Sequence, residues 1–254
     1  FALRYTKFLK VQRKDNKYKF DFSESIHKIN QSGHDLIEEI IKRQENQLKS
    51  LSHLNYFRVI EASVDWRLII GLGGGHVQET DMTLHHIYGI PYIPGTAIKG
   101  ALKHWAEDEK QKKELIDKIF GKQDYRGDLI FLDAFPVSEV TLAMDIMNPH
   151  YPDYYGGNKY PTDCQNPNPI PFLTIEDTKF RFIYLCAKKN ENAINYLDKI
   201  VEWLGTDNDQ SKGVFQTKGI GAKTAVGYGY FKGIKDKTKE FEVKFIAKEK
   251  EIDR

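Results

Sequence analysis

The clearest β-strand in the sequence is Ile60-Glu61-Ala62-Ser63-Val64-Asp65-Trp66-Arg67-Leu68-Ile69-Ile70. Apolar and polar residues alternate along it, as expected of a strand that buries one face. The face expected to enter the core carries Ile60, Ala62, Val64, Trp66, Leu68 and Ile70. A cluster of glycines that begins at Gly71 ends the strand, and the other elements are placed outward from here.

Four segments around this strand have the 3.6-residue apolar period of amphipathic helices. The first, 35–48, precedes the strand, and the second begins after Pro94 with Thr96 as its expected N-cap. Two further patterns follow at 115–120 and 194–204, and a glycine ends each of them. The chain therefore alternates helical and extended segments.

Four more extended segments complete the pattern: 129–132, 180–187, 226–232 and 241–247. The continuous apolar run 129–132 is typical of a central strand that is covered on both faces. The order strand, helix, strand, strand, helix, strand is that of a ferredoxin-like unit. We therefore expect an α+β fold, a decorated ferredoxin-like (RRM-like) domain in which helices cover one face of an antiparallel sheet.

Composition along the chain suggests how it is organised. Residues 1–55 are expected to form an N-terminal helical extension, and residues 56–254 the ferredoxin-like domain. Within that domain, the segment 145–178 fits neither period and holds six of the nine prolines, mixed with aromatic residues such as Tyr154 and Tyr155. Disordered linkers are poor in aromatic residues, so we expect an ordered, irregular insert that packs on a binding partner.

Charge and cysteine content exclude several classes of protein. The 254 residues include 38 Lys plus Arg against 36 Asp plus Glu, so a nucleic-acid-binding chain would have to gather its basic residues on one face. Two cysteines are too few for a disulfide scaffold, and Cys186 lies in an apolar run, where we expect a buried thiol. No apolar run approaches the ~20 residues that span a bilayer. With no signal-like stretch either, we expect a cytoplasmic protein without a membrane partner.

The strongest functional motif is the glycine loop, Gly219-Ile220-Gly221-Ala222-Lys223-Thr224-Ala225-Val226-Gly227-Tyr228-Gly229-Tyr230. Glycines allow positive φ angles and let a backbone approach a ligand closely. A Walker A loop is disfavoured because Ala222 separates Gly221 from Lys223, and a Rossmann loop because no helix follows. Two interpretations remain. The loop is either a nest of backbone N–H groups beside Lys218 and Lys223 that binds phosphates, or a tight turn between strands.

A second motif is Tyr88-Gly89-Ile90-Pro91-Tyr92-Ile93-Pro94-Gly95-Thr96-Ala97-Ile98-Lys99-Gly100-Ala101-Leu102-Lys103. A helix start offers unpaired N–H groups and a positive dipole end to an anion, and Lys99 and Lys103 lie in the first turns. An ordinary capped helix with solvated lysines accounts for the same pattern, so both interpretations stay open.

These two motifs together resemble the RAMP superfamily of CRISPR systems, whose modified ferredoxin folds carry a late glycine-rich loop and an early Ile-Pro-Gly-x-x-x-Lys-Gly helix. Three further motifs look like those of the sixth Cmr subunits of type III-B effectors. They are Gly-Asp-Leu-Ile-Phe-Leu-Asp-Ala-Phe-Pro at 127–136, Asp-Ile-Met-Asn-Pro-His-Tyr at 145–151 and Pro-Thr-Asp-Cys-Gln-Asn-Pro-Asn-Pro-Ile-Pro-Phe at 161–172. The resemblance covers about Trp66 to Phe231.

The resemblance implies a non-catalytic subunit that holds CRISPR guide RNA near its 3′ end, at one end of a filament of related subunits, in antiviral defence. Its partners would be the guide RNA, target RNA as a second candidate, and the other Cmr subunits. The expected RNA-binding residues are Lys99, Lys103, Lys218, Gly219, Gly221, Lys223, Thr224, Gly227, Gly229, His85 and His86. No cofactor, metal or catalytic residue is expected.

Two alternatives stay open beside this one. RAMP endoribonucleases use His, Tyr and Lys for metal-independent acid–base cleavage, and His85 or His86 with a lysine would serve such a reaction. Asp81 also lies between the first strand and first helix, the stretch in which a neighbouring Cmr subunit carries its catalytic Asp. The other alternative is a purely structural subunit that contacts only protein. We favour RNA-lining or structural roles for the histidines.

Overall fold

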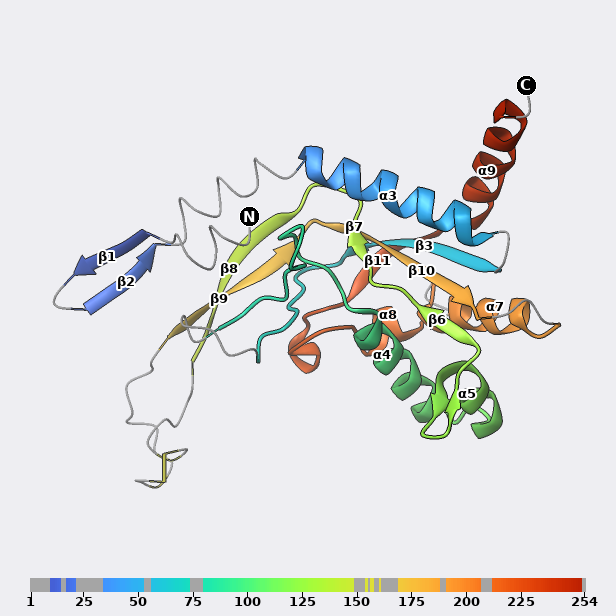
Figure 1. Ribbon diagram of the computed structural model, residues 1–254. Helices are drawn as coiled ribbons and strands as arrows, with labels where there is room; N and C mark the ends of the chain where they lie inside the picture. Colours follow the sequence, from blue (N-terminus) through green and yellow to red (C-terminus); the bar gives the residue numbers. More distant parts are fainter. Residues whose placement is uncertain are drawn as a thin grey trace.

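A five-stranded antiparallel sheet forms the centre of the structure (Figure 1). Its strands lie in the order β11 (Phe231–Asp236), β3 (Phe57–Val64), β10 (Lys179–Cys186) and β6 (Leu129–Phe131), and β7 (Phe135–Pro136) pairs with the start of β10. This computed structural model describes residues 10–14, 17–21, 34–52, 56–73, 80–148, 154, 156–157, 160, 169–187, 191–206 and 212–252.

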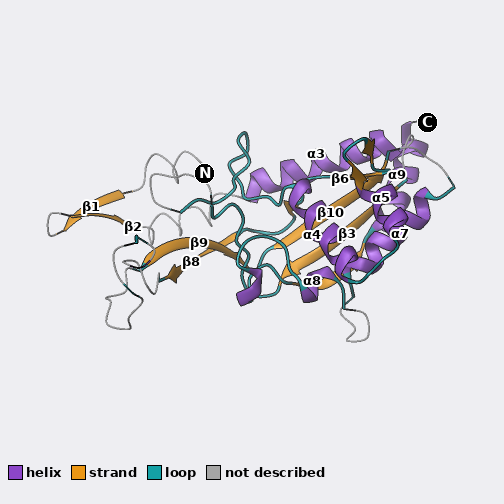
Figure 2. Cartoon of the chain, turned by 90° about the horizontal axis from the view of Figure 1, so that it is seen from below, coloured by secondary structure: helices purple, strands orange, loops and turns teal. Residues whose placement is uncertain are grey.

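Helices between the strands occupy one face of this sheet. α4 (Gly95–Asp108) lies between β3 and β6 in the chain, with α5 (Lys113–Phe120) after it, and α7 (Ala193–Leu204) lies between β10 and β11. Figure 2 shows α4 and α7 lying across β3 and β10. Numbered along the chain, the four main strands have the spatial order 4-1-3-2 of a ferredoxin-like unit. The predicted α+β, ferredoxin-like fold is confirmed.

A second helical layer covers the opposite face of the sheet. It consists of α3 (His34–Ser52) and α9 (Thr238–Ile252) (Figure 1). Because side chains alternate along a strand, Ile60 of β3 packs in the core beneath α4 and α7, whereas Val59 packs with Leu48 of α3. The ferredoxin-like helices thus occupy one face, as predicted, and these two additions cover the other.

Shorter elements complete the described structure. They are the hairpins β1 (Lys10–Lys14) with β2 (Lys17–Asp21), β4 (Gly121–Lys122) with β5 (Tyr125–Arg126) and β8 (Thr141–Met147) with β9 (Ile170–Glu176), the helix α8 (Val214–Thr217) and the 3-10 helix η1 (Thr224–Val226). In Figure 1 the β8–β9 hairpin extends away from the central sheet.

The segments expected to lie outside the ferredoxin-like unit differ in part from the prediction. The insert 145–178 is not irregular at its ends, which belong to β8 and β9; Tyr154 is exposed, and Tyr155 lies outside the described residues. The extension 1–55 contains α3 and, in addition, the β1–β2 hairpin, so it is not helical throughout. α3 also contributes Ile37 to the main core, and the boundary at residue 55 stays a prediction.

β3 is shorter than the strand predicted over 60–70. It ends at Val64, and the chain bends at residues 65–66 before it runs on in an extended form. Leu68 and Ile70 are buried on the far side of the bend, in the same core as the strand. The apolar alternation therefore continued across a point at which the backbone changes its pairing partners.

Two other predicted strands are shifted. The run 129–132 was expected to be a central strand, but β6 lies at one end of the strand order and has β10 as its neighbour there. The segment 226–232 was expected to be extended throughout, but the strand begins only at Phe231. Gly227 and Gly229 have φ angles of +98° and +76°, which a strand does not permit.

The predicted strand 241–247 is wrong, because this segment is part of α9. Phe241, Val243 and Phe245 fit the period of a strand, but the four-residue spacing of the two phenylalanines also fits one face of a helix. Both phenylalanines are buried, whereas Val243 is 67% exposed. The carboxylate of Asp236 stabilises the helix start by accepting the backbone N–H two residues later at 2.8 Å.

Phe245→Ala should lower the free energy of unfolding by about 3 kcal/mol, because it leaves a cavity between α9 and the sheet. The Phe245 ring lies 6.1 Å from the ring of Phe57 and 5.9 Å from that of Phe241, between centroids. Urea unfolding measures the loss. Val243→Ala, on the exposed side of the same helix, is the control and should change stability by less than about 0.5 kcal/mol. Equal losses at the two positions would contradict this packing.

Candidate nucleic-acid interface

An extended junction segment, residues 65–71, connects the parts of the candidate site. It follows β3 and presents its backbone groups to two edges, as extended chains do. The glycine loop lies along the first edge. The N–H of Gly229 donates to the carbonyl of Arg67 at 2.7 Å, and the N–H of Ala222 donates to the carbonyl of Ile69 at 2.9 Å.

Two other segments bond to the remaining backbone groups of the junction segment. Leu68 exchanges a pair of hydrogen bonds with Ile175 of β9, at 2.8 and 2.9 Å. The carbonyl of Ile70 accepts the N–H of Thr83 at 2.8 Å. The glycine loop, the β8–β9 hairpin and the segment 80–93 therefore meet on one short stretch of backbone.

The backbone requires glycine at two positions of the loop. Gly221 has a φ of +106°, and a Cβ there would collide with the carbonyl of Ile69. Gly229 has a φ of +76°, and a Cβ there would collide with the carbonyl of Ile220. A side chain at either position would also strain the left-handed backbone. Positive φ angles occur as well at Gly219, Lys223 and Gly227.

The turn at residues 223–226 has unused backbone donors. Lys223 is left-handed, with φ 58° and ψ 32°, and the 3-10 helix η1 follows it directly. Within the part of the chain that the structure describes, the N–H groups of Lys223, Thr224 and Ala225 have no acceptor. A left-handed residue followed by right-handed ones directs successive N–H groups to one side, which is the nest geometry that binds anions.

The two lysines predicted at the loop have different surroundings. The ammonium of Lys223 lies 5.9 Å from the centre of the Phe172 ring, and among the described residues it has no acidic partner. Lys218 forms a 2.6 Å ion pair with Asp108, which lies 3.6 Å from His104. The hydrogen bond with Asp108 raises the pKa of Lys218 and lowers that of Asp108. Lys218 therefore attaches the loop to the end of α4.

Asp145 of β8 links the β8–β9 hairpin to the glycine loop through side-chain hydrogen bonds. Its carboxylate accepts the hydroxyl of Tyr228 at 2.7 Å and the guanidinium of Arg67 at 2.5 Å, and Arg67 also bonds Glu176 at 3.4 Å. Partial burial pulls the pKa of Asp145 upward, but these two donors and the N–H of Ile146 outweigh it and lower the pKa. Burial and the bond to Asp145 raise the pKa of Tyr228 to about 12.

Trp66 is the residue at this site that the sequence analysis placed wrongly. The alternating pattern predicted it in the core, but the bend after β3 leaves it 50% exposed. Its indole lies 4.9 Å from the ring of Tyr228, and the guanidinium of Arg67 lies 5.4 Å from its centre. Asp65 and Arg67 continue the same alternation as Glu61 and Ser63, so the sequence carried no signal of the bend.

The start of α4 differs from the predicted anion site. Thr96 does not cap the helix; the side chain of Asp133 instead accepts the N–H of Gly95 at 2.7 Å. A carboxylate of the protein itself thus occupies this end of the helix. Lys99 and Lys103 are half-buried. They lie about 13 and 7 Å along the axis of α4 from Asp108, the helix residue that pairs with Lys218 of the loop.

His85 and His86 lie in an aromatic cluster. Their rings stack at 4.9 Å, and the His85 ring also stacks on that of Tyr88 at 4.4 Å. Nδ1 of His85 accepts the backbone N–H groups of Ile87 and Tyr88 at 3.3 and 3.4 Å, so this ring stabilises its own turn. Burial, and then the charge of His86, lower the pKa of His85, against the opposing effect of Asp133. The lowered pKa favours the neutral form of the His85 imidazole.

The described residues also bear on metal binding, on catalysis by Asp81 and on membrane insertion. Among them, no group of three or more His, Cys, Asp or Glu side chains could hold a metal ion. Asp81 accepts the N–H of Met82 at 2.8 Å, which is a local turn contact. Cys186 is a buried thiol, as predicted. No helix in this part of the chain has the length and apolar character needed to cross a bilayer.

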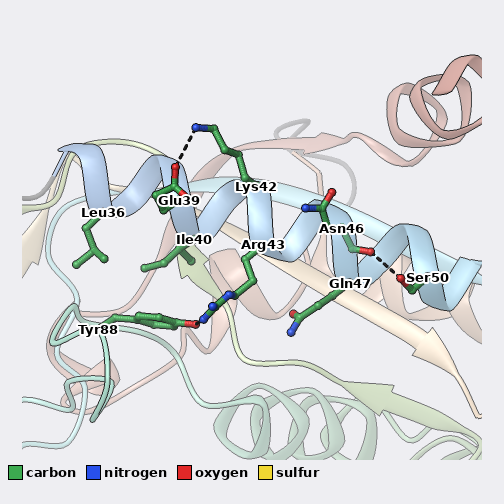
Figure 3. Close-up of a pocket in the computed structure, with 9 residues that line it drawn as sticks. All are labelled: Leu36, Glu39, Ile40, Lys42, Arg43, Asn46, Gln47, Ser50 and Tyr88. Carbon is green, nitrogen blue, oxygen red and sulfur yellow. Dashed lines mark hydrogen bonds and ion pairs between the residues drawn. The ribbon is translucent and has the colours of Figure 1, made fainter. Parts of the chain in front are cut away.

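A separate hollow of about 560 Å³ runs along α3 (Figure 3). It is lined by Leu36, Glu39, Ile40, Lys42, Arg43, Asn46, Gln47, Ser50 and Tyr88. Figure 3 shows Arg43 pointing to the hydroxyl of Tyr88, to which it donates at 2.5 Å, while Lys42 pairs with Glu39 at 3.0 Å. Its two cationic side chains thus have partners within the hollow, and it shares no residue with the glycine loop.

The fold and the loop together define the class of protein. The sequence model of the RAMP superfamily matches residues 67–232, from Arg67 in the junction segment to the first residues of β11. The match includes β6, β7 and β10, both ferredoxin-like helices and the entire glycine loop, and it begins just after β3, which ends at Val64. The chain belongs to the RAMP superfamily.

Individual relatives narrow the comparison. The CRISPR system Cmr subunit Cmr6 of Pyrococcus furiosus is 30% identical, over 64% of this chain and 64% of the relative. Cmr6 of Saccharolobus solfataricus is 27% identical, over 76% of this chain and 64% of the relative. The chain thus spans less than two thirds of the length of both. These relatives confirm the resemblance to sixth Cmr subunits.

A solved structure supports the fold. It is the cryo-EM structure of the Type III-B Cmr-beta bound to cognate target RNA, one chain of which superimposes with a TM-score of 0.60 at 24% identity. The superposition covers 81% of this chain and 67% of that one. At this level of identity the likeness shows the shared fold.

Gly221→Ala should lower the free energy of unfolding by about 1–3 kcal/mol, because it strains a left-handed position and displaces the carbonyl of Ile69. Thermal or urea unfolding measures the change. Gly100→Ala is the control, since this exposed glycine in α4 has open space around it and alanine should stabilise the helix by about 0.5–1 kcal/mol. Changes of the same sign at both positions would contradict the described loop geometry.

Proposed function

We propose that this chain is a non-catalytic RNA-binding subunit of a type III-B CRISPR (Cmr) ribonucleoprotein that acts in antiviral defence. The glycine loop holds the backbone of the guide RNA near its 3′ end. The observation that carries the proposal is the set of unbonded N–H groups at Lys223, Thr224 and Ala225, beside a lysine without an acidic partner among the described residues. Such a set binds phosphate oxygens.

The charge distribution supports a site of this kind. The net charge of the chain is only +2, so non-specific attraction of RNA is weak. Lys218, Lys232 and Arg67, which surround the loop, are each paired with a carboxylate. Phosphate binding then depends on neutral N–H donors and on Lys223. The remaining predicted contacts, at Lys99, Lys103 and the histidines, lie on other elements and belong to the proposal as secondary contacts.

The comparisons support the type of complex. The two curated relatives are named as Cmr subunits of CRISPR systems, and the solved complex with the same fold is bound to cognate target RNA. RAMP membership and the glycine loop agree with guide RNA as the partner of this chain, with target RNA as the second candidate. Neighbouring Cmr subunits are the proposed protein partners.

The β8–β9 hairpin is the proposed contact with a neighbouring subunit or with RNA. It projects from the sheet (Figure 1) and exposes Met144 and Ile146 on one side of β8, while Asp145 turns toward the loop. Tyr154 and Tyr160 in the connecting segment are exposed as well. Exposed apolar and aromatic side chains on a projecting element are typical of interaction surfaces.

Lys223→Ala should weaken the binding of different single-stranded RNAs by a similar factor, because a lysine and backbone N–H groups recognise phosphate rather than bases. The slope of log affinity against log salt should also fall in magnitude by about 0.7 for one lost phosphate contact. Titration of RNAs of unlike sequence at several salt concentrations measures both. Substitution of Lys223 is a better test than substitution of Gly221, because Gly221 also maintains the fold.

Lys42→Ala is the matched control for this experiment. Lys42 is exposed on α3, on the opposite face of the sheet, and its removal should change neither the affinity nor the salt slope. If Lys223→Ala behaves like this control, the glycine loop is only a turn and the proposed phosphate site is wrong.

The purified chain should retain labelled guide RNA without cutting it, with or without EDTA. His85 is occupied with its own turn, and no lysine hydrogen-bonds or pairs with it among the described residues. A denaturing gel after prolonged incubation detects product. Cleavage that falls with His85→Ala or His86→Ala would instead establish a metal-independent endoribonuclease. A chain that neither retains nor cleaves the RNA would be a purely structural subunit.

A further inference from the structure

Trp66 lies at the edge of the glycine loop with half of its side chain in solvent. The residues that follow it in the junction segment, Leu68 and Ile69, are fully buried. Single exposed apolar side chains are common on protein surfaces, so exposure alone identifies no site. What distinguishes Trp66 is the way in which the neighbouring residues hold it.

The indole rests on a supported aromatic ring. The rings of Trp66 and Tyr228 lie 4.9 Å apart at an angle of 34°, and Tyr228 is itself buried. Tyr228 is fixed by its hydrogen bond to Asp145 and by an edge contact with the Phe172 ring at 6.2 Å. The guanidinium of Arg67 lies 5.4 Å from the indole and is anchored to the same Asp145. A ring held in this way loses little conformational freedom when a ligand stacks on it.

The position of the indole is matched to the proposed phosphate site. A Cβ at Gly227 would lie 4.0 Å from the ring of Trp66, so a larger side chain there would contact the indole. Glycine leaves this part of the ring uncovered. Gly227 directly follows η1, and the unbonded N–H groups begin at Lys223, four residues earlier. An aromatic surface and phosphate donors therefore lie on one short turn.

We propose that Trp66 is a stacking platform for one base of the single-stranded RNA whose phosphate is held by the glycine loop. The inference rests on the proposed function and adds to it the residue that contacts a base. Every base has a π-face, so such a platform accepts any sequence, as the phosphate donors do. An RNA duplex hides the faces of its bases, so the platform selects single strands.

Tryptophan fluorescence tests the proposal directly. The chain has three tryptophans, and Trp105 and Trp203 are only 9% and 0% exposed, so Trp66 is the one that solvent and ligands reach. Short single-stranded RNA should quench the emission of the full chain. An abasic oligomer of the same length, which offers phosphates without bases, should bind without this quenching.

Substitutions give the second readout. Trp66→Ala should weaken RNA binding by between about 5- and 160-fold, the range equivalent to about 1–3 kcal/mol per stacked base, and should leave abasic binding unchanged. Trp66→Phe should keep most of the affinity, which separates loss of an aromatic face from loss of folding. Lys223→Ala should weaken both ligands, because it acts on phosphate.

The outcomes distinguish this inference from the proposed function. If RNA binds the unaltered chain without changing its tryptophan emission, and binds Trp66→Ala with the same affinity, Trp66 is not a stacking platform. The glycine-loop site would remain intact in that case. RNA that fails to bind the unaltered chain would overturn both. If Trp66→Ala binds RNA normally but no longer co-purifies with other Cmr subunits, the indole contacts protein and the platform is equally overturned.

Discussion

The backbone hydrogen bonds of the junction segment are the constraint on which the site depends. An extended chain directs the polar groups of successive residues to opposite edges. Arg67 and Ile69 bond to the glycine loop, and Leu68 between them bonds to β9. Gly221 and Gly229 allow the loop to approach that closely, since a Cβ at either would strike a carbonyl. These backbone bonds act together with shared core packing, in which Ile220 of the loop and Ile175 of the hairpin lie in the same buried cluster as Leu68.

One carboxylate reinforces this arrangement through side chains. Asp145, on β8, accepts hydrogen bonds from Arg67 in the junction segment and from Tyr228 in the loop. All three are partly or largely buried, where an unpaired charge would be costly, so the pairing is mutually required. The same pairing neutralises Arg67 and leaves Lys223 as the loop cation without an acidic partner among the described residues.

Much of the fold follows from the sequence, and the failures have one physical origin. Periodicity indicates which residues can share one face, but it reports neither which segment covers that face nor where the cover ends, as the exposed Trp66 shows. The alternation of 60–70 correctly indicated extended chain, but it could not show the change of partners at Trp66, because Leu68 and Ile70 are buried on the far side of the bend. In 241–247 the same apolar residues fit two periods, and contact with Phe57 on the sheet selects the helix.

The candidate site was predictable to a similar extent, and its two motifs have unequal outcomes. Both were interpreted as sets of free N–H groups, one at the start of α4 and one in the glycine loop. At α4, Asp133 takes the N–H of Gly95, so a carboxylate of the chain already fills the place of a phosphate. In the loop, the carboxylate of Asp145 accepts Arg67, Tyr228 and the N–H of Ile146, and no carboxylate among the described residues accepts the N–H groups of residues 223–225. Which N–H groups remain free is thus decided by acidic residues distant in sequence, 38 positions away for Gly95. No local motif records that contact, and for this reason the sequence could name both sites but not choose between them.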